Sequence, residues 1–378
     1  MMKMSEKKIN ILYVIWSLGL GGAERVVIDL AKGLDRSRFQ PFICCLNEEG
    51  TFAKELKDSL IQIFELNKKA GLDFSVIGKI VRIIKDHNIH LVHTHLWGAN
   101  VWGRVAGFKA QVPVVVTEHN IDVWKRWYHR WIDRRLAPKT NKICVVSEKV
   151  KQFYINHVHL SSSKLQVVYN GIKLSEKNSD AAHVQKIKNE FNIKDGSPIL
   201  ANIGRLVEAK ANHIFIRALE ELDRRAVEFH ALMIGDGPLK EALTAQGQAL
   251  IRKNKLTLTG LRKDVQQILD IVDVAVLSST REGFSIVVLE CMAKGIPFVA
   301  TDVGGNREQV VDGKTGFIVD VNQPLPLAQA ISKIIQDSGL ASRIGENARQ
   351  RAREYFSIER MVQTTQEIYA QALGEGAL

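Results

Sequence analysis

Short apolar runs rich in Val, Ile and Leu alternate with amphipathic stretches along the whole chain. These runs predict six strands in each half, at 8–16, 41–46, 61–66, 90–95, 113–118 and 142–147, then at 198–203, 229–234, 255–259, 273–278, 297–301 and 316–319. The residues with helical spacing after the first run are Ala23, Val26, Val27, Leu30, Ala31 and Leu34. Unbroken apolar strands separated by helices are typical of parallel sheets covered on both faces. We therefore expect an α/β fold of two Rossmann-like, doubly wound parallel-sheet domains.

The domain boundary is expected within 172–197, because the polar segment that follows the first half carries no strand pattern. This gives an N-terminal domain over 1–175 and a C-terminal domain over 176–356. A last helix is predicted over 357–373, and we expect the C-terminal segment to 378 to pack back on the N-terminal domain. The apolar residues of that helix are Ile358, Met361, Ile368 and Ala372.

Several classes of protein are excluded by the same pattern. No window approaches the ~18 consecutive apolar residues of a membrane-spanning helix. The N-terminus runs from a short basic segment directly into the first strand without a small-residue cleavage site, which argues against a signal peptide. Four cysteines lie in or beside apolar runs without metal-binding spacing, and they indicate reduced core residues of a cytoplasmic protein. They are Cys44, Cys45, Cys144 and Cys291.

The net charge of +11 belongs to one half of the 378 residues. Residues 1–180 hold 28 Lys and Arg against 17 Asp and Glu, whereas residues 181–378 hold 24 of each. The six tryptophans also lie in the first half, at Trp16, Trp97, Trp102, Trp124, Trp127 and Trp131. We expect the basic half to meet an acidic partner.

A glycine-rich loop, SLGLGGAER, follows the first predicted strand. Glu24 stands where a dinucleotide fingerprint needs its third glycine, which argues against NAD. Gly21 and Gly22 still allow the backbone to approach an anionic group or a sugar at the start of a helix. A tight turn without a ligand is the alternative.

The loop after strand 273–278 reads STREGFSIVVLECMAKG and carries two glutamates eight residues apart. Gly283 allows a sharp turn, and Ser285 is predicted to cap a helix that runs to about Lys294. Glu282 then lies at the carboxyl edge of the sheet beside free helix N–H groups, with Glu290 roughly two turns along. Two carboxylates beside an anion site suit a sugar nucleotide, and a solvated pair of helix glutamates is the alternative.

Cations follow another predicted strand of the second half. Arg205 and Lys210 come after strand 198–203, and a forked guanidinium with a mobile ammonium is able to hold a pyrophosphate. The turn at Gly235, in IGDGP, lets backbone approach a ligand. Backbone groups of Leu261, after strand 255–259, are placed to contact a base edge.

These motifs together resemble glycosyltransferases of family 4, which have the GT-B architecture of two Rossmann-like domains facing a cleft. The similar segments span nearly the whole chain: GGAER (21–25), TEHN (117–120), VVYNGI (167–172), GRLVEAK (204–210), IGDGP (234–238) and EGFSIVVLE (282–290). The resemblance implies a retaining transferase whose C-terminal domain binds a nucleotide sugar without a metal. The chain has no Asp-x-Asp pair, which argues against the metal-dependent GT-A class.

The resemblance implies a role for each matching residue of the C-terminal domain. Arg205 and Lys210 would clamp the pyrophosphate and neutralise the leaving group. Glu282 would bond hydroxyls of the donor sugar, and Glu290 those of the ribose. Backbone contacts would come from Gly283, Phe284 and Ser285. The lysine is followed by Ala211-Asn212 where the family usually has Gly-His, and this departure leaves the turn geometry open.

Residues of the N-terminal domain complete the implied site. Gly21 and Gly22 would approach the donor phosphate, and His119 would lie near the transferred sugar. A histidine after a strand also commonly bonds a backbone carbonyl, and that alternative stays open for His119. His95 is a weaker candidate, for acceptor contact.

The segment 122–139 adds detail to the charge argument. Aromatic residues at helical spacing are Trp124, Trp127, Tyr128 and Trp131, and the basic residues among them are Lys125, Arg126, Arg130, Arg134 and Arg135. Such a helix suits an anionic membrane surface, and the segment 124–135 is the predicted contact. Packing of the tryptophans on the sheet is the alternative. No nucleic-acid-binding module is recognisable, so nucleic acid is not expected as a partner.

The sequence thus predicts a cytoplasmic hexosyltransferase associated with the inner face of a membrane. It would move a sugar from a nucleoside diphosphate donor, UDP or GDP, to a glycan or lipid-linked acceptor in cell-surface polysaccharide or glycolipid synthesis. No metal and no cofactor beyond the donor is expected. The alternatives are a sugar-nucleotide epimerase of the same architecture and a non-catalytic nucleotide-sugar-binding protein.

Overall fold

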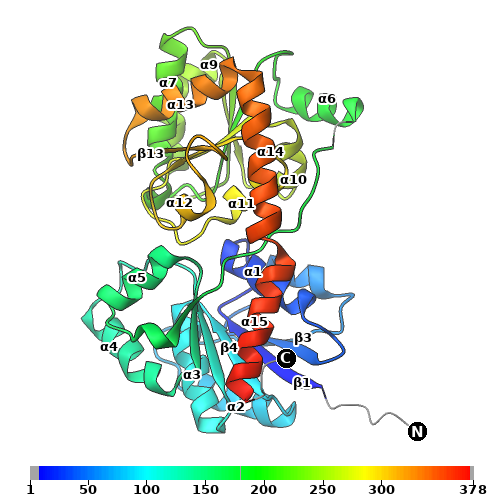
Figure 1. Cartoon of the computed structure of the whole chain (residues 1–378), viewed down its shortest axis with the longest axis vertical. Helices are drawn as coiled ribbons and strands as arrows, with labels where there is room; N and C mark the ends of the chain where they lie inside the picture. The colour runs from blue at the N-terminus through cyan, green and yellow to red at the C-terminus, as the bar shows by residue number, and fades with distance from the viewer. Residues whose placement is uncertain (1–7, 179, 375–378) are drawn as a thin grey trace. The chain divides into compact units, whose positions relative to one another are not determined.

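Parallel sheets form the centres of two structural units. The computed structural model describes residues 8–178 and 180–374. The first unit is Met1–Gly171 with Ile358–Leu378, and the second is Ile172–Ser357 (Figure 1). Both sheets are parallel throughout, which confirms the predicted fold class of two Rossmann-like domains. The first seven residues, part of the segment that argued against a signal peptide, lie outside the described residues.

The sheet of the first unit has seven strands in the order β3-β2-β1-β4-β5-β6-β7. The strands are β1 (Ile9–Ile15), β2 (Phe39–Cys45), β3 (Gln62–Glu65), β4 (Leu91–His95), β5 (Val114–Glu118), β6 (Lys142–Val145) and β7 (Leu165–Val167). The helices are α1 (Gly22–Gly33), α2 (Ser75–Asp86), α3 (Trp97–Ala110), α4 (Trp127–Leu136), α5 (Glu148–Asn156) and α15 (Ile358–Leu373), with short 3-10 turns η1 (Thr51–Leu56), η2 (Ala137–Lys139) and η3 (Ser162–Lys164). Six strands were predicted here, and the edge strand β7 is the addition.

The sheet of the second unit has six strands in the order β10-β9-β8-β11-β12-β13. They are β8 (Ile199–Ile203), β9 (His230–Ile234), β10 (Leu256–Gly260), β11 (Val274–Leu277), β12 (Phe298–Thr301) and β13 (Phe317–Val319). The helices are α6 (Ala181–Glu190), α7 (Asn212–Arg224), α8 (Lys240–Gln246), α9 (Gln248–Arg252), α10 (Val265–Ile268), α11 (Ile286–Ala293), α12 (Asn306–Gln309), α13 (Pro324–Gln336) and α14 (Ser338–Tyr355), with 3-10 turns η4 (Glu208–Lys210) and η5 (Leu269–Ile271).

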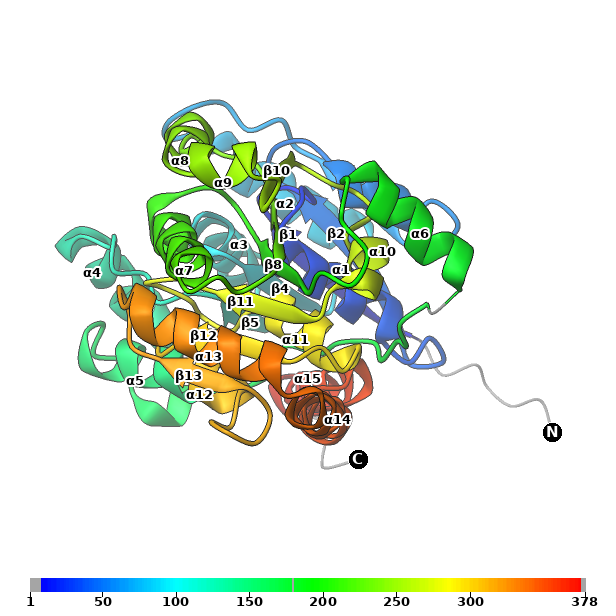
Figure 2. The ribbon, with the colours of Figure 1, turned by 90° about the horizontal axis from the view of Figure 1, so that it is seen from above.

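Burial explains why unbroken apolar runs predicted these strands. Every residue of β4, β5, β8 and β9 is buried, because helices cover both faces of each sheet. In the second unit, α7 and α13 lie side by side over one face, as Figure 2 shows from above, and they enclose an apolar core with β8, β9 and β11. The four cysteines are buried and free, as predicted.

The helix α15 packs on α1 inside the first unit. A methyl carbon of Val362 lies 2.6 Å from where a Cβ of Gly33 would be, so glycine is required for this close approach. Deeper in, Tyr369 accepts a hydrogen bond from His93 Nδ1 at 2.6 Å and donates one to the Tyr13 hydroxyl at 3.0 Å. The end of the chain therefore completes the polar and apolar core of the unit that the chain began.

The chain passes between the units twice, at residues 171–172 and 357–358. The Ile172 N–H donates to the Phe356 carbonyl at 2.8 Å, and Ile172 forms an isolated bridge with Ser357. The polar segment after this crossing holds α6, a helix that the sequence pattern did not indicate. Within 8–178 and 180–374, no helix is both long and apolar enough to cross a bilayer.

Candidate functional site

Two loops at the carboxyl ends of adjacent strands bring the predicted lysine and one predicted glutamate into contact. Lys210 ends η4 after β8, and Glu282 lies in the loop after β11. Lys210 Nζ lies 2.5 Å from Glu282 Oε1, and Ser279 Oγ donates to the same oxygen at 2.6 Å. These strands flank the point where the strand order reverses, which is where sheets of this kind bind ligands. The pair is a charge-assisted contact fixed at that edge.

Arg205, the second predicted cation, is not paired as Lys210 is. Arg205 is exposed, and its guanidinium makes no ion pair with any residue that the structure describes. Its forked donors are therefore available to a bidentate acceptor such as a phosphate. Leu261, after β10, is also exposed, at 61%.

The structure explains why glycine is needed at position 235, which the sequence did not reveal. Its φ is +145°, and a Cβ there would lie 1.9 Å from the carbonyl oxygen of Gly204. The Gly235 N–H also donates to the Gly260 carbonyl at 3.0 Å. The loops after β8, β9 and β10 thus approach one another backbone to backbone, and only glycine fits the position.

The turn that carries Glu282 is braced by the segment after β12. Gly304 has a φ of +52°, and a Cβ there would lie 2.0 Å from the Glu282 carbonyl oxygen. The Gly305 N–H donates to the Gly283 carbonyl at 2.9 Å. The side-chain amide of Gln309 accepts from the Ser285 N–H at 3.1 Å and donates to the Ser285 carbonyl at 2.8 Å. This fixes the entry into α11.

The capping prediction for Ser285 is half wrong. The helix α11 begins after Ser285 and ends at Ala293, as predicted, but the hydroxyl of Ser285 makes no capping hydrogen bond. In the part of the chain that the structure describes, the N-cap side chain thus leaves the first N–H groups of α11 for an acceptor from elsewhere.

The remaining predicted residues of the second unit lie on or beside α11. Glu290 accepts a hydrogen bond from Gln266 Nε2 at 2.9 Å, so it is tied to α10 rather than simply solvated. Phe284 is buried and packs edge-on against Phe356, with ring centroids 5.3 Å apart. Its side chain serves the core, so a ligand role would fall to its backbone.

The other predicted residues belong to the first unit. Gly21 precedes α1, and a Cβ there would lie 2.2 Å from the carboxylate of Glu24. Gly22 is exposed at the first position of that helix. His119 follows β5 and is 7% exposed, and its Nε2 lies 3.0 Å from Nδ1 of fully buried His95. Its partner is therefore another side chain and not a backbone carbonyl. Burial lowers the pKa of His119 to about 3.

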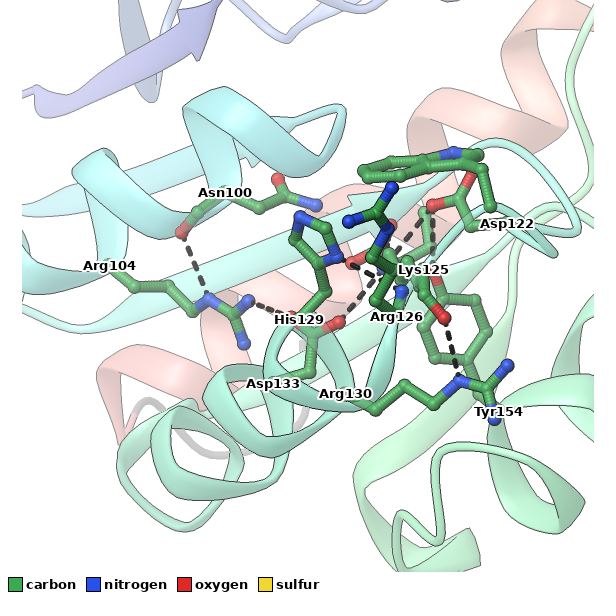
Figure 3. Close-up of polar contacts among 11 residues, drawn as sticks. Asn100, Arg104, Asp122, Lys125, Arg126, His129, Arg130, Asp133 and Tyr154 are labelled. Carbon is green, nitrogen blue, oxygen red and sulfur yellow. Dashed lines mark hydrogen bonds and ion pairs between the residues drawn. The ribbon is translucent and has the colours of Figure 1, made fainter. Parts of the chain in front are cut away.

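The basic and aromatic segment differs from its prediction in two ways. The helix α4 begins at Trp127, so Trp124 lies in the preceding turn. Lys125 is 1% exposed instead of lying on the basic face, because its Nζ contacts Asp133 at 2.9 Å and Asp122 at 3.2 Å (Figure 3). Its Nζ also lies 3.7 Å from Glu118.

The aromatic side chains of this segment are exposed, which contradicts the alternative that they pack on the sheet. The exposed fractions are 51% for Trp124, 77% for Trp127, 39% for Tyr128 and 50% for Trp131. Arg126, Arg134 and Arg135 are exposed beside them.

Several partners of the predicted residues escaped sequence analysis. The sequence carried a signal for Ser279, because it is a hydroxyl residue directly after predicted strand 273–278 and three positions before Glu282. Gln266 and Gln309 gave no signal, because both come from other loops and meet their partners only in the fold. Among the described residues, no group of three or more His, Cys, Asp or Glu could hold a metal ion.

Two family models match this chain, and together they take up most of it. Residues 20–176 match the family described as "Glycosyltransferase Family 4", and residues 183–351 match "Glycosyl transferases group 1". The chain is 26% identical over 97% of its length to an Escherichia coli enzyme, of which it covers 98%. That enzyme is named UDP-Gal:alpha-D-GlcNAc-diphosphoundecaprenol alpha-1,3-galactosyltransferase.

Solved structures agree with the fold over nearly the whole chain. A glycosyltransferase from Rickettsia africae superposes with a TM-score of 0.87 at 25% identity, covering 98% of this chain and 100% of that one. Anabaena HepE in complex with UDP-glucose gives a TM-score of 0.85 at 24% identity, covering 96% and 100%. The motifs, both family matches and the fold agree: the chain belongs to glycosyltransferase family 4 and is a hexosyltransferase of the GT-B fold.

Proposed function

We propose that this enzyme transfers a hexosyl unit, with retention of anomeric configuration, from a UDP-sugar to a lipid-linked glycan. The product would serve cell-surface polysaccharide or glycolipid synthesis. The E. coli relative supports this proposal, because its name gives UDP-galactose as the donor and a sugar on a lipid diphosphate as the acceptor. A GDP-sugar is the alternative donor.

The observation that carries the proposal is the Lys210–Glu282 pair at the carboxyl edge of the second sheet. Cleavage of the bond between the sugar and the diphosphate leaves negative charge on the diphosphate. Lys210 and exposed Arg205 would stabilise that charge, and the uncapped start of α11 would add backbone N–H donors. Glu282, held by Ser279, would accept hydrogen bonds from the sugar hydroxyls. The acceptor hydroxyl would replace the diphosphate and lose its proton to the departing phosphate.

The other predicted residues keep their implied roles in this proposal. Glu290 would bind the ribose, with backbone contacts from Gly283, Phe284, Ser285, Gly235 and Leu261. Gly21 and Gly22 of the first unit would approach the donor phosphate, and His119 would lie near the transferred sugar. No metal would be required.

Steady-state transfer assays in EDTA, with UDP-galactose, UDP-glucose and a GDP-hexose, test this proposal. UDP-sugars should turn over, and Arg205→Ala and Lys210→Ala should each lower kcat by about 10²–10³, the usual cost of removing one transition-state charge contact. Lys194→Ala removes an exposed lysine of the same unit and is the control. Full activity of Arg205→Ala would overturn the clamp, and conversion of the donor without acceptor would indicate an epimerase.

We also propose that the enzyme works at the inner face of a membrane, through α4 and the turn before it. Exposed tryptophans beside exposed arginines support this, because indoles favour the headgroup region and each cation near anionic lipid contributes about 1 kcal/mol. A lipid-linked acceptor would be found at that surface.

A further inference from the structure

The helix α14 supports the donor loop, residues 282–285, from inside the second unit. It packs on α11, the helix that the donor loop enters (Figure 1). A Cβ on Gly345 of α14 would lie 2.1 Å from the carbonyl oxygen of Gly295, two residues after α11. At the other end of α14, the Phe356 carbonyl accepts from the Ile172 N–H at 2.8 Å. Both ends of α14 are therefore fixed within this unit, and the side chains of its last turn have a firm base.

Arg351, near the end of α14, holds the end of α12. Its Nε donates to the Gln309 carbonyl at 2.9 Å, and its Nη2 donates to the Glu308 carbonyl at 2.6 Å. These are the last two residues of the four-residue helix α12, and the final carbonyls of a helix have no partner inside it. A helix of one turn is not stable by itself. The position of α12 therefore depends on contacts from outside, and the forked guanidinium of Arg351 suits two neighbouring carbonyls.

Gln309 transmits this support to the donor loop. Its side chain is fully buried, and its amide bonds both the N–H and the carbonyl of Ser285, at 3.1 and 2.8 Å. Ser285 is the last residue before α11. The backbone of Gln309 is thus held by Arg351, and its side chain holds Ser285. Because Ser285 leads directly into α11, its orientation decides where the first N–H groups of that helix point.

A second, aromatic route joins Arg351 to the same loop. Its Cζ lies over the rings of Tyr355 and Phe356, 5.0 and 5.4 Å from their centroids. Phe356 packs edge-on against Phe284, with ring centroids 5.3 Å apart, and both phenylalanines are buried. Cations over aromatic rings attract them. Two adjacent residues of the donor loop, Phe284 and Ser285, are thus held from one guanidinium by contacts of different chemistry.

We propose that Arg351 is a positioning residue for glycosyl transfer, and that it acts through Gln309 and Phe356 on the backbone that binds the donor diphosphate. Two of its nitrogens donate to carbonyls and its Cζ lies over aromatic rings. It therefore stands behind the donor loop, whereas Arg205 would touch the donor itself. The inference rests on the proposed function, which gives the backbone of 283–285 and the start of α11 their contacts with the donor. It adds the residue that sets the geometry of those contacts.

Arg351→Met tests this role, because it removes the guanidinium and keeps a long side chain. Arg353→Met is the matched control, since Arg353 is exposed on the same helix and donates to Gln350 at 3.2 Å. Calorimetric titration compares UDP with uridine, and GDP with guanosine as the alternative pair. Arg351→Met should raise the Kd of UDP roughly tenfold, the usual cost of losing one hydrogen bond to a charged group, and leave the Kd of uridine unchanged. Arg353→Met should change neither.

Arg351→Lys separates geometry from charge. Lysine keeps the positive charge but lacks the planar fork that serves two carbonyls and lies over a ring, so most of the rise in the Kd of UDP should persist. Full rescue by lysine would show that the charge alone attracts the diphosphate, and it would overturn the positioning role. An equal rise in the Kd of UDP and of uridine would show general damage to the unit and would overturn it as well.

Amide hydrogen exchange of the ligand-free wild type needs no variant fold. The Ser285 amide, bonded to the Gln309 side chain, should exchange slowly, and the amide of exposed Arg281 should exchange fast. Equally fast exchange at both would show that the support is not formed. If the wild type binds UDP and Arg351→Met binds it equally well, the proposed donor site stands and the positioning role is wrong. If the wild type binds neither UDP nor GDP, the proposed function fails, and this inference fails with it.

Discussion

Glu118 shows how the surroundings of one residue set its charge. Burial raises the pKa of this carboxyl to about 7, against the opposing effect of Lys125, with Asp133 and Asp122 adding to the rise. Arg104, which pairs with Asp133 at 2.6 Å, also lowers this pKa, but its effect is smaller than that of burial. A proton on Glu118 therefore stabilises the first unit at mildly acidic pH.

Glu118→Gln tests this directly, because glutamine keeps the shape and does not titrate. Between the unfolded pKa near 4.5 and the folded pKa near 7, the native state binds the extra proton, so the wild type loses stability as pH rises. The free energy of unfolding of Glu118→Gln relative to wild type should increase by roughly 2 kcal/mol from pH 5 to pH 8.

Urea unfolding followed by tryptophan fluorescence measures this, since all six tryptophans lie in the unit that holds Glu118. Equal differences at pH 5 and pH 8 would show that Glu118 is ionised throughout. Gln185→Glu, an exposed change in the second unit, is the control for added bulk charge effects.

At the scale of elements, α4 and its preceding turn present the aromatic and basic surface. The turn is held from inside: Lys125 donates to Tyr154 at 2.8 Å as well as to Asp133, and Arg130 Nε donates to the Lys125 carbonyl at 3.0 Å. Trp124 and Arg126 lie on either side of buried Lys125 in the sequence, and both side chains are exposed. A rigid presentation lowers the entropy lost when such side chains bind a surface.

Trp127→Ala combined with Arg134→Ala should weaken binding to anionic liposomes at least fivefold, since the arginine alone contributes about 1 kcal/mol near such lipid. Both side chains are exposed, and neither belongs to the Lys125 cluster. Flotation at two salt concentrations measures the effect, with Lys194→Ala as the charge control. Unchanged flotation would show that α4 does not bind the membrane.

The strands were predictable, whereas contacts across elements were not. All twelve predicted strands are present with ends within two residues. Burial leaves an apolar run in the sequence of most of them, although β3, β10 and β13 are at most partly buried. The faces of α4 were assigned wrongly at Lys125, because helical spacing was carried through residues that precede the helix. Its three carboxylate partners are spread over 118–133, and no periodicity reports that they converge. Likewise, Lys210 and Glu282 were each predicted, but their direct pairing appears only in the fold.

At the scale of the molecule, α15 belongs to the first unit although it follows the second in the chain. Tyr369 is its innermost polar contact, and it links His93 to Tyr13 at positions far apart in the sequence. The periodicity of 357–373 predicted the helix, but nothing in the sequence indicated this hydrogen-bonded chain.

Tyr369→Phe should lower the stability of the first unit by about 1–3 kcal/mol, because it leaves the buried N–H of His93 without an acceptor. Tyr355→Phe, at an exposed position of α14, should cost little and is the control. Urea midpoints by fluorescence report the first unit, and UDP-dependent stabilisation reports the second. A loss as small as that of the control would show that His93 finds another acceptor.

The return of the chain through α15 has a consequence for the order of events during synthesis. A ribosome adds all of Ile172–Ser357 before it adds Ile358–Leu373, so every residue of the second unit is made before the first unit has α15. Until α15 is made, the first unit lacks the helix that covers α1 around Gly33 and the buried groups beneath it. Nascent chains usually fold from the N-terminus onward. Here α15, made after the second unit, completes the unit that was begun before it.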